Sequence, residues 1–320
     1  NQSNKNWITE QYDQMVMCDT AQRSGGDAAI TKIHNKEKAI AVTVDSSANY
    51  SKSHPSTGGK QIVCESWRNL ISVGAKPIAI TNCLNFGNPE NPEIMGEFAE
   101  SILGIKEACE YLDYPVVSGN VSFYNGTNKK NIYPTPVIGG VGLISKLKSK
   151  MNHVLKEEGN PILLVGKTFG HLYQSAFFEE IHSIIEGPPP EINLLNEKNN
   201  GKFVSNLIQN NLVKSVHDIS SGGLIVALAE MCINSSYGIK IEKPKKLSNL
   251  FSYFYGEDQG RYLIEIEKNN LKKVEKLFKN NNIFQEIIGV TQKNDFELPG
   301  ELKINIKDLF NINNKWYYNY

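Results

Sequence analysis

The sequence has 320 residues, a length for which two domains of ordinary size are expected. Its hydrophobic content of 40% and charged content of 21% are typical of a soluble globular protein. The 34 basic residues balance the 34 acidic ones, and no apolar run is long enough to span a bilayer. These features argue against a nucleic-acid partner and against a membrane partner.

The five cysteines are scattered and never form a CxxC pair, which favours free thiols over disulfides or a zinc site. We therefore expect a cytoplasmic protein. The chain begins at Asn1 rather than at Met, so we also expect a further segment upstream.

Strands and helices alternate in the first half of the chain, after a polar opening segment. Strands are predicted over 38–45, 77–86, 114–124 and 135–144, and helices over 58–74 and 93–112. The first helix is expected to start at Gly58-Gly59 and to end at Gly74, ahead of Pro77.

The pattern restarts after residue 150, so we divide the chain into domains 1–155 and 156–320. Strands are predicted over 160–167, 214–220, 238–242, 261–267 and 286–291, and helices over 194–213, 221–236 and 270–280. A kink is expected at Gly201, and Asn/Lys-rich stretches such as 197–202 are expected to be solvated loops. The fold class that follows is a layered α/β or α+β architecture.

Oxygen-bearing side chains recur where predicted strands end and helices begin. Asp45 ends one strand and Asp218 another, Glu65 and Asn69 share one helix face, and Ser220 opens a Gly-rich helix start. Any one of these residues alone is typical of a helix cap or of an acid on the protein surface. Together they form the hard-oxygen set that Mg²⁺ with phosphates requires, and the N–H groups of the Gly-rich helix start would bind the anion.

The stretch "VVSGNVSFYN" (116–125) begins as a buried strand and is then interrupted by Gly119-Asn120. One interpretation is a β-bulge whose Asn amide bonds to neighbouring backbone. The other is that Gly119 lets a nucleotide approach while Asn120 offers its side-chain oxygen to a metal ion.

Four motifs make the family recognisable. "TNCLNFGNPENPE", "PVVSGNVSFYNGT", "YPTPVIGGVGLI" and "HDISSGGLIVALAEM" resemble, in this order, the small synthetase subunit of the phosphoribosylformylglycinamidine synthases. "WITEQYDQMV" followed by "GGDAAI" resembles the stretch that leads into the second half of that subunit. The resemblance covers essentially the whole chain and places it as the C-terminal half, within the aminoimidazole ribonucleotide (AIR) synthetase-like superfamily.

The resemblance implies an ATP-dependent C–N ligase of purine (IMP) biosynthesis, which converts formylglycinamide ribonucleotide and glutamine-derived ammonia into the amidine. ATP is the co-substrate and Mg²⁺ the cofactor. The implied fold is an N-terminal ATP-binding-type domain, whose sheet pairs with a matching domain into a barrel-like core, followed by a C-terminal α/β domain. Implied partners are the chain's own N-terminal half, a glutaminase subunit and a small bridging subunit. We expect this half alone to be inactive and to form a homodimer through the exposed pairing sheet.

The resemblance also implies roles for individual residues that match positions in the family's motifs. Asn82 and Gly119 match ATP-binding positions, Asn120 a metal ligand and Ser122 a substrate contact. Asn82 stands where many relatives carry Asp, which weakens any metal-linked role. The set Asp45, Glu65, Asn69, Asp218 and Ser220 matches an auxiliary nucleotide and magnesium site of large single-chain relatives. The family's catalytic groups match no position in this chain.

Other assignments stay open at this point. We interpret His217 as a packing residue at a strand end rather than as a general base. His54 is expected to lie in a loop, where a contact with phosphate is an alternative that nothing else in the sequence supports. Arg261 is either a structural ion-pair donor or a ligand contact. A stand-alone or structural Mg-nucleotide-binding module without turnover is the alternative function. Another enzyme of the superfamily has less support, because those enzymes lack "CLNFGNP".

Overall fold

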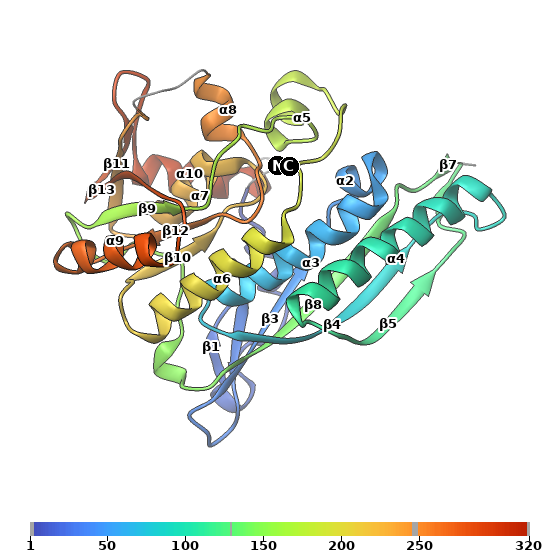
Figure 1. Cartoon of the computed structure of the whole chain (residues 1–320), viewed down its shortest axis with the longest axis horizontal. Coiled ribbons are helices and arrows are strands. Elements are labelled where there is room, and N and C mark those ends of the chain that lie inside the picture. The colour runs from blue at the N-terminus through green and yellow to red at the C-terminus, as the bar shows by residue number, and fades with distance from the viewer. Residues whose placement is uncertain (1–2, 129, 245–248, 319–320) are drawn as a thin grey trace.

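The structure, a computed structural model, describes residues 3–128, 130–244 and 249–318. Two large sheets lie side by side in it, and the first half of the chain forms one of them while the second half forms the other (Figure 1). A small hairpin of β6 (Gly126–Thr127) and β7 (Lys130–Asn131) extends from the first sheet. Among the described residues, no helix combines the length and apolar character needed to cross a bilayer.

The first sheet has six strands in the order β1-β2-β3-β8-β4-β5. In this order they are Thr20–Gln22, Ala29–Lys32, Ala39–Asp45, Thr135–Ile144, Lys76–Asn85 and Val116–Ser122. Strands β4 and β5 run parallel, and the other neighbours run antiparallel. Four of these strands confirm the strands predicted from the apolar pattern.

Helices α3 (Pro55–Ser72) and α4 (Pro92–Leu112) cover one face of this sheet, as Figure 1 shows. The predicted start of α3 at its two glycines is wrong, because the helix already begins at Pro55 with His54 as its N-cap. The glycines serve packing instead. A Cβ on Gly59 would lie 2.4 Å from the carbonyl oxygen of Ser101, so the backbones of α3 and α4 approach too closely for a side chain there.

The other face of the first sheet is open. Strand β3 alternates strictly between buried and exposed residues, and its outward side chains are Ile40, Val42 and Val44, which are 40%, 44% and 70% exposed. A β-branched row of this kind normally faces a core. The six strands form an open sheet, so a barrel-like core would need a second sheet against this face.

The second sheet has seven strands in the order β10-β12-β9-β13-β11-β14-β15. In this order they are Ser215–Asp218, Tyr262–Glu265, Pro161–Val165, Gln285–Lys293, Tyr237–Ile241, Asp295–Leu298 and Leu302–Asn305. Every neighbouring pair is antiparallel except β11 with β14, so the predicted α/β domain is a mixed, mainly antiparallel one.

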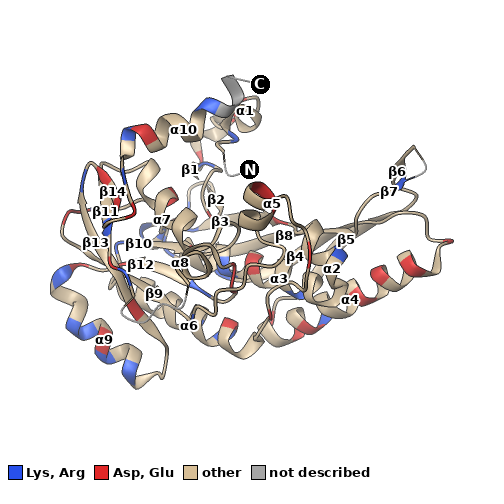
Figure 2. Cartoon of the chain, turned by 90° about the horizontal axis from the view of Figure 1, so that it is seen from above, with Lys and Arg blue, Asp and Glu red and all other residues tan. Residues whose placement is uncertain are grey.

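Helices cover both faces of the second sheet. Helices α6 (Leu194–Gln209) and α9 (Leu271–Asn280) pack on one face. Helices α7 (Gly223–Ile233), α8 (Leu250–Tyr255) and α10 (Ile306–Tyr318) pack on the other, as seen from above in Figure 2. All five residues of β9 are therefore buried, which explains their unbroken apolar run.

One hydrophobic cluster joins the two halves, because α6 packs against α3. The kink predicted at Gly201 is wrong: α6 is one continuous helix, and a Cβ on Gly201 would lie 2.1 Å from the Trp67 ring. The Asn/Lys-rich stretch 197–202 is also not a solvated loop but part of this helix, with Glu197 and Asn200 buried. Several elements have no counterpart among the predicted ones. They include the short helices α1 (Asn6–Thr9), α2 (Ala48–Ser53), α5 (Ala176–His182) and α8, the longer helix α10, and strands β1, β2, β14 and β15.

Candidate functional site

The five residues assigned to the auxiliary site come together between the two halves of the chain. Asp45 ends β3, Glu65 and Asn69 lie on α3, and Asp218 ends β10 with Ser220 just beyond it. The Asn69 amide donates to Asp45 Oδ1 at 2.7 Å, and a side-chain hydrogen bond joins Glu65 to Ser220. Helix α3 thus links a strand end of the first sheet to a strand end of the second.

Arg68 is the central cation of this cluster, and sequence reasoning missed it. Its guanidinium is fully buried and donates to Asp218 Oδ1 at 2.7 Å, to Glu197 Oε1 at 2.8 Å and to Gln259 Oε1 at 3.0 Å. A signal existed, since Arg68 follows Glu65 by three residues and shares its helix face. The role of Glu197 could not be predicted, because it lies in an Asn/Lys-rich stretch of the kind that is usually exposed to solvent.

Burial raises the pKa values of the carboxyl groups in this cluster. The pKa of Asp45 lies well above its usual range because of burial and the charges of Glu65 and Asp218. Burial and the Asp218 charge raise the pKa of Glu65 to about 7. The pKa of Asp218 is raised as well, mainly by burial, although Arg68 opposes the shift. One guanidinium does not offset these carboxyl groups, so without a further cation the cluster favours the protonated form of some of them.

An unpaired buried oxygen shows where a cation would fit. Asp218 Oδ2 is buried without a hydrogen-bond partner, a state that normally costs free energy. Carboxylate and amide oxygens are the donors that Mg²⁺ prefers, and a bound divalent ion would reverse the pKa shifts of the acids around it. Asp45, Glu65, Asn69 and Asp218 are therefore residues of the types that Mg²⁺ prefers. Among the described residues, the three acids do not bring one oxygen each within 4.8 Å of one another, so they would have to move closer together to bind one ion.

A cavity of about 260 Å³ opens beside this cluster. It is lined by Ser46, Ser47, Ala48, Asn49, Tyr50, Gln61, Glu65, Gln174, Ala176, Glu179, Ser220, Ser221, Glu257 and Gln259. The hydroxyl and amide groups of this wall suit a polar ligand, and Glu65 connects the cavity to the acidic cluster.

The expected anion site at the Gly-rich start of α7 needs a correction. The Gly222 N–H donates to Glu257 Oε1 at 2.7 Å, and the Ala176 N–H donates to the same oxygen at 2.8 Å. Tyr50 donates its hydroxyl proton to the other oxygen of Glu257. A carboxylate of the chain thus occupies this helix start, and the Gly223 N–H bonds to the Ser220 carbonyl.

The second predicted group, Asn82, Gly119, Asn120 and Ser122, lies at the far edge of the first sheet. Asn82 pairs with Gly119 across β4 and β5. Because side chains alternate along a strand, Asn82 and Gly119 face helix α4, whereas Asn120 and Ser122 face the open side of the sheet. The strand is not buried as expected, since β5 is the edge strand and its residues are largely exposed.

Gly119 has a clear steric role. A Cβ at this position would lie 1.9 Å from Asn82 Oδ1, so the missing side chain makes room for the Asn82 amide. The register irregularity of β5 lies between Val116 and Ser118, and not at Gly119-Asn120 as the bulge interpretation supposed. Neither interpretation of the stretch anticipated the contact between Asn82 and Gly119.

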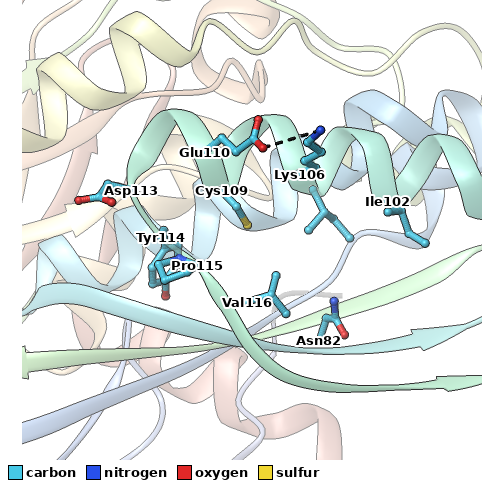
Figure 3. A pocket seen from close by; sticks show the side chains of 10 residues that line it. Asn82, Ile102, Lys106, Cys109, Glu110, Asp113, Tyr114, Pro115 and Val116 are labelled. Carbon is cyan, nitrogen blue, oxygen red and sulfur yellow. Dashed lines mark ion pairs between the residues drawn. The ribbon is translucent and has the colours of Figure 1, made fainter.

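Figure 3 shows the pocket between this strand edge and α4, with Asn82 and Val116 on the strands and Ile102 and Lys106 on the helix. Its volume is about 390 Å³, and an adjoining hollow of about 520 Å³ follows the strand to Val121. Lys106, 3.8 Å from Glu110, is the cation among the residues that line the pocket. The wall is otherwise mainly apolar.

The remaining candidates have structural partners. His54 caps α3 by accepting the Thr57 N–H at 3.3 Å. Arg261 is fully buried and donates to the carbonyl oxygens of Asp258 and Gly256 and to the Thr168 hydroxyl, which favours its structural interpretation. His217 contacts Asp27 and Glu230, which outweigh the effect of burial and raise its pKa well above the usual range, so a general-base role is not supported.

Comparisons with known proteins agree on the family. The model of the AIR synthase related protein N-terminal domain matches residues 25–144, and that of the C-terminal domain matches residues 157–298. The phosphoribosylformylglycinamidine synthase subunit PurL of Pelagibacter ubique is 52% identical over 320 residues, which are 100% of this chain and 44% of that protein. The subunit PurL of Rhodopseudomonas palustris (strain BisB5) is 44% identical over 316 residues, 99% of this chain and 43% of that protein.

Solved structures show the same fold at low identity. "T. maritima PurL complexed with FGAR" matches with a TM-score of 0.75 and 14% identity, over 96% of this chain and 50% of that one. "T. maritima PurL complexed with ATP" matches with a TM-score of 0.61 and 23% identity, over 91% of this chain and 41% of that one. The chain therefore spans about half the length of the curated relatives it matches.

Proposed function

The chain belongs to the AIR synthase related protein family, and we propose that it supplies the C-terminal half of a phosphoribosylformylglycinamidine synthase. The single observation that carries this proposal is 52% identity to a PurL subunit along the entire chain. The proposed reaction is the ATP-dependent conversion of formylglycinamide ribonucleotide and ammonia into the amidine. Catalysis of this type depends mainly on positioning and on stabilising charge.

We propose that the acidic cluster is an auxiliary magnesium-nucleotide site. Asp45, Glu65, Asn69 and Asp218 would hold Mg²⁺, which supplies positive charge next to phosphate oxygens when it is bound. The serines at the cavity, Ser220 among them, would donate to those oxygens. Arg68 holds Asp218 in place from within α3. Support comes from the hydrogen bonds that join Asp45 to Asn69 and Glu65 to Ser220, from the raised pKa values and from the unpaired Asp218 Oδ2.

We propose that the β4–β5 edge forms one wall of the active site. Asn82 and Gly119 would contact ATP, Asn120 would bind a metal ion and Ser122 would bind the substrate. The sheet register supports a shared wall, because it places the four residues on two adjacent strands. The register also places the two pairs on opposite faces of the sheet. Asn120 and Ser122 would therefore contact groups of the partner domain that covers the open face.

The open face of the first sheet is the proposed contact for the missing half of the enzyme. Pairing would cover Ile40, Val42 and Val44 and close the barrel-like core. We propose that the isolated chain forms a homodimer through the same face. A structure titled "Structure of PurLQS from Thermotoga maritima" matches with a TM-score of 0.67, which supports further glutaminase and bridging subunits as partners by analogy.

We further propose a domain division near residue 155 and a cytoplasmic location. The two sheets lie on either side of this point, and the two family models leave residues 145–156 unmatched. The cysteines Cys18, Cys64, Cys83, Cys109 and Cys232 are all unpaired, as in a reducing compartment.

Reconstitution tests the proposed activity. The chain is mixed with its N-terminal half, a glutaminase subunit, glutamine, formylglycinamide ribonucleotide and Mg·ATP, and ADP and amidine formation are measured. We expect turnover in the complete mixture and none with this chain alone. Asn120→Ala should lower turnover, whereas Asn128→Ala in the exposed hairpin loop should not. The assignment would be refuted if all components are present and folded but no ATP-dependent amidine formation is measured.

A stand-alone magnesium-nucleotide-binding module is the second candidate. It is favoured by the fact that the acidic cluster and its cavity lie wholly within this chain. Calorimetry with Mg·ADP distinguishes the two functions. Tight binding that Asp45→Asn abolishes and exposed Asp308→Asn preserves, together with no turnover in the complete mixture, would favour the module.

A further inference from the structure

A second cluster of metal-binding side chains lies on the opposite side of β10 from the acidic cluster. Asp27 comes from the loop between β1 and β2, His153 from the segment that connects the two sheets, and His217 from β10. Each offers one ligand atom, and these atoms all lie within 4.8 Å of one another. Successive side chains of a strand point to opposite sides, so His217 and its neighbour Asp218 serve different clusters.

Two ligand atoms of this cluster are buried and lack hydrogen-bond partners. They are His153 Nδ1 and Asp27 Oδ2, in side chains whose residues are 7% and 8% exposed. Leaving a buried polar atom without a hydrogen-bond partner normally costs free energy. Two unpaired atoms in the same buried cluster indicate that something absent from the polypeptide satisfies both.

The surroundings hold the three side chains in place. His217 Nδ1 lies 2.7 Å from Asp27 Oδ1, and the rings of His153 and His217 are tilted against each other with their centroids 4.9 Å apart. A Cβ on Gly26 would lie 2.9 Å from the His153 ring, so this glycine gives the imidazole its space. The backbone of Asn152 accepts from the Val216 N–H at 3.1 Å, which ties the connecting segment to β10.

Glu230 on α7 contacts the cluster of Asp27, His153 and His217 without being one of the three proposed ligands. Its Oε2 lies 3.1 Å from His217 Nε2, the nitrogen that faces away from Asp27. A histidine that binds a metal through one nitrogen commonly donates its other N–H to a carboxylate, which fixes the ring and increases its basicity. Glu230 is therefore a positioning residue for His217.

We propose that Asp27, His153 and His217 form a transition-metal site that clamps the two halves of the chain together. Two imidazoles and one carboxylate are a donor set for Zn²⁺ or a similar ion rather than for Mg²⁺. Ligands of a tetrahedral Zn²⁺ lie about 3.3 Å apart, given bonds of about 2.0 Å, so the three side chains need to close in by about 1.5 Å at most. Binding would replace a proton between His217 Nδ1 and Asp27 and leave one coordination position for water.

Zinc titration of the full chain, in excess Mg²⁺ to fill the acidic cluster, tests this proposal. A competing chromophoric chelator reports affinity, and elemental analysis reports the metal content. We expect about one tightly bound Zn²⁺ per chain and, on Co²⁺ substitution, the visible absorption of a tetrahedral site with nitrogen ligands. The thermal midpoint should rise with Zn²⁺ in the same experiment.

Three variants and a control assign the site. Asp27→Asn and His153→Phe should abolish Zn²⁺ binding, and Glu230→Gln should weaken it by about 10–100-fold. His34→Phe is the matched control, because His34 also lies 2.9 Å from an aspartate but belongs to an exposed pair. If the His153→Phe variant fails to fold, the loss of Zn²⁺ binding is judged from the near-isosteric Asp27→Asn variant. The proposal is overturned if the wild type binds no Zn²⁺ in excess Mg²⁺, or if Asp27→Asn binds it as the wild type does.

Discussion

Arg68 of α3 and Asp218 of β10 form a buried ion pair, with 2.7 Å between Nε and Oδ1. Both side chains are almost completely removed from solvent, and they come from opposite halves of the chain. The guanidinium also binds Glu197, so one cation holds two carboxylates of the second half against the first. This contact connects the stability of the interface to the geometry of the acidic cluster.

Removing Arg68 should be strongly destabilising. Arg68→Met leaves Asp218 and Glu197 buried without their cation, and breaking a buried pair in this way typically costs roughly 3–5 kcal/mol. Urea denaturation measures the change in the free energy of unfolding. Lys106→Met is the control, because the Lys106–Glu110 pair is exposed and its loss should change little. Equal stability of the wild type and Arg68→Met would contradict the role assigned to this pair.

Glu65 should make the stability of the metal-free chain depend on pH. Burial and Asp218 raise its pKa from 4.5 to about 7, so between these values the folded chain keeps a proton that the unfolded chain has lost. The free energy of unfolding should therefore fall as the pH rises through this range, and Glu65→Gln should flatten that fall. Denaturation at about pH 5 and about pH 8 measures the slope. Identical slopes for both proteins would exclude Glu65 as the cause.

Magnesium should counteract this pH effect. The ion binds the deprotonated carboxylates, so its affinity should rise with pH through about 7 and its stabilising effect should be largest at high pH. Thermal melts with and without MgCl₂ across this pH range measure the effect. Asp45→Asn should reduce the shift, whereas exposed Asp308→Asn should preserve it. A magnesium shift that survives Asp45→Asn unchanged would place the ion elsewhere.

Gly119→Ala should disturb the β4–β5 edge through Asn82. The new methyl group would overlap Asn82 Oδ1, and such overpacking typically costs roughly 1–3 kcal/mol. Asn82→Ala removes that oxygen, so the double variant should recover part of the lost stability. Chemical denaturation of the four proteins of this cycle gives the coupling free energy between the two positions. Strictly additive effects would show that the two side chains do not compete for this space.

A charge on the open face should prevent pairing without unfolding the chain. Val44 is 70% exposed on β3, so Val44→Glu should leave the fold unchanged by circular dichroism but reduce both homodimer formation and binding of the N-terminal half. Light scattering coupled to size-exclusion chromatography measures the mass. Ile181→Glu on α5 is the control at a similarly exposed apolar residue, and it should leave assembly intact. An unaltered dimer of Val44→Glu would show that this face is not the interface.

Local patterns were sufficient to predict four strands of the first sheet and its two long helices, but not strands β1 and β2. The alternation in 38–45 and the amphipathic run in 93–112 report which residues face a core, so they indicate strand or helix without knowledge of the partner. Short elements such as α2, α5 and α8 were missed, because six or seven residues carry too little periodicity. The glycines of α3 were misread as a helix start, since close helix packing leaves the same local signature.

For the acidic cluster, residue chemistry indicated the members and the fold revealed their counter-charge. Asp45 and Asp218 were recognisable as oxygen donors at strand ends, and Glu65 and Asn69 as donors on one helix face. Arg68 and Glu197 were not, because a charged residue looks the same in sequence whether it faces solvent or a buried partner 129 positions away. Burial is a property of the packed chain, and it is burial that turns Glu197 into a structural ligand of Arg68.

The amino-acid order by itself determined the family, the alternation of elements and the donor chemistry, because these depend on residue type and spacing along the chain. Only the tertiary structure decided that β5 is an edge, that Gly119 accommodates Asn82, that Glu257 occupies the start of α7, and that Asp27 meets two histidines. Those relationships join residues far apart in the chain, and their energies arise from desolvation and close packing, which exist only once the two halves have come together.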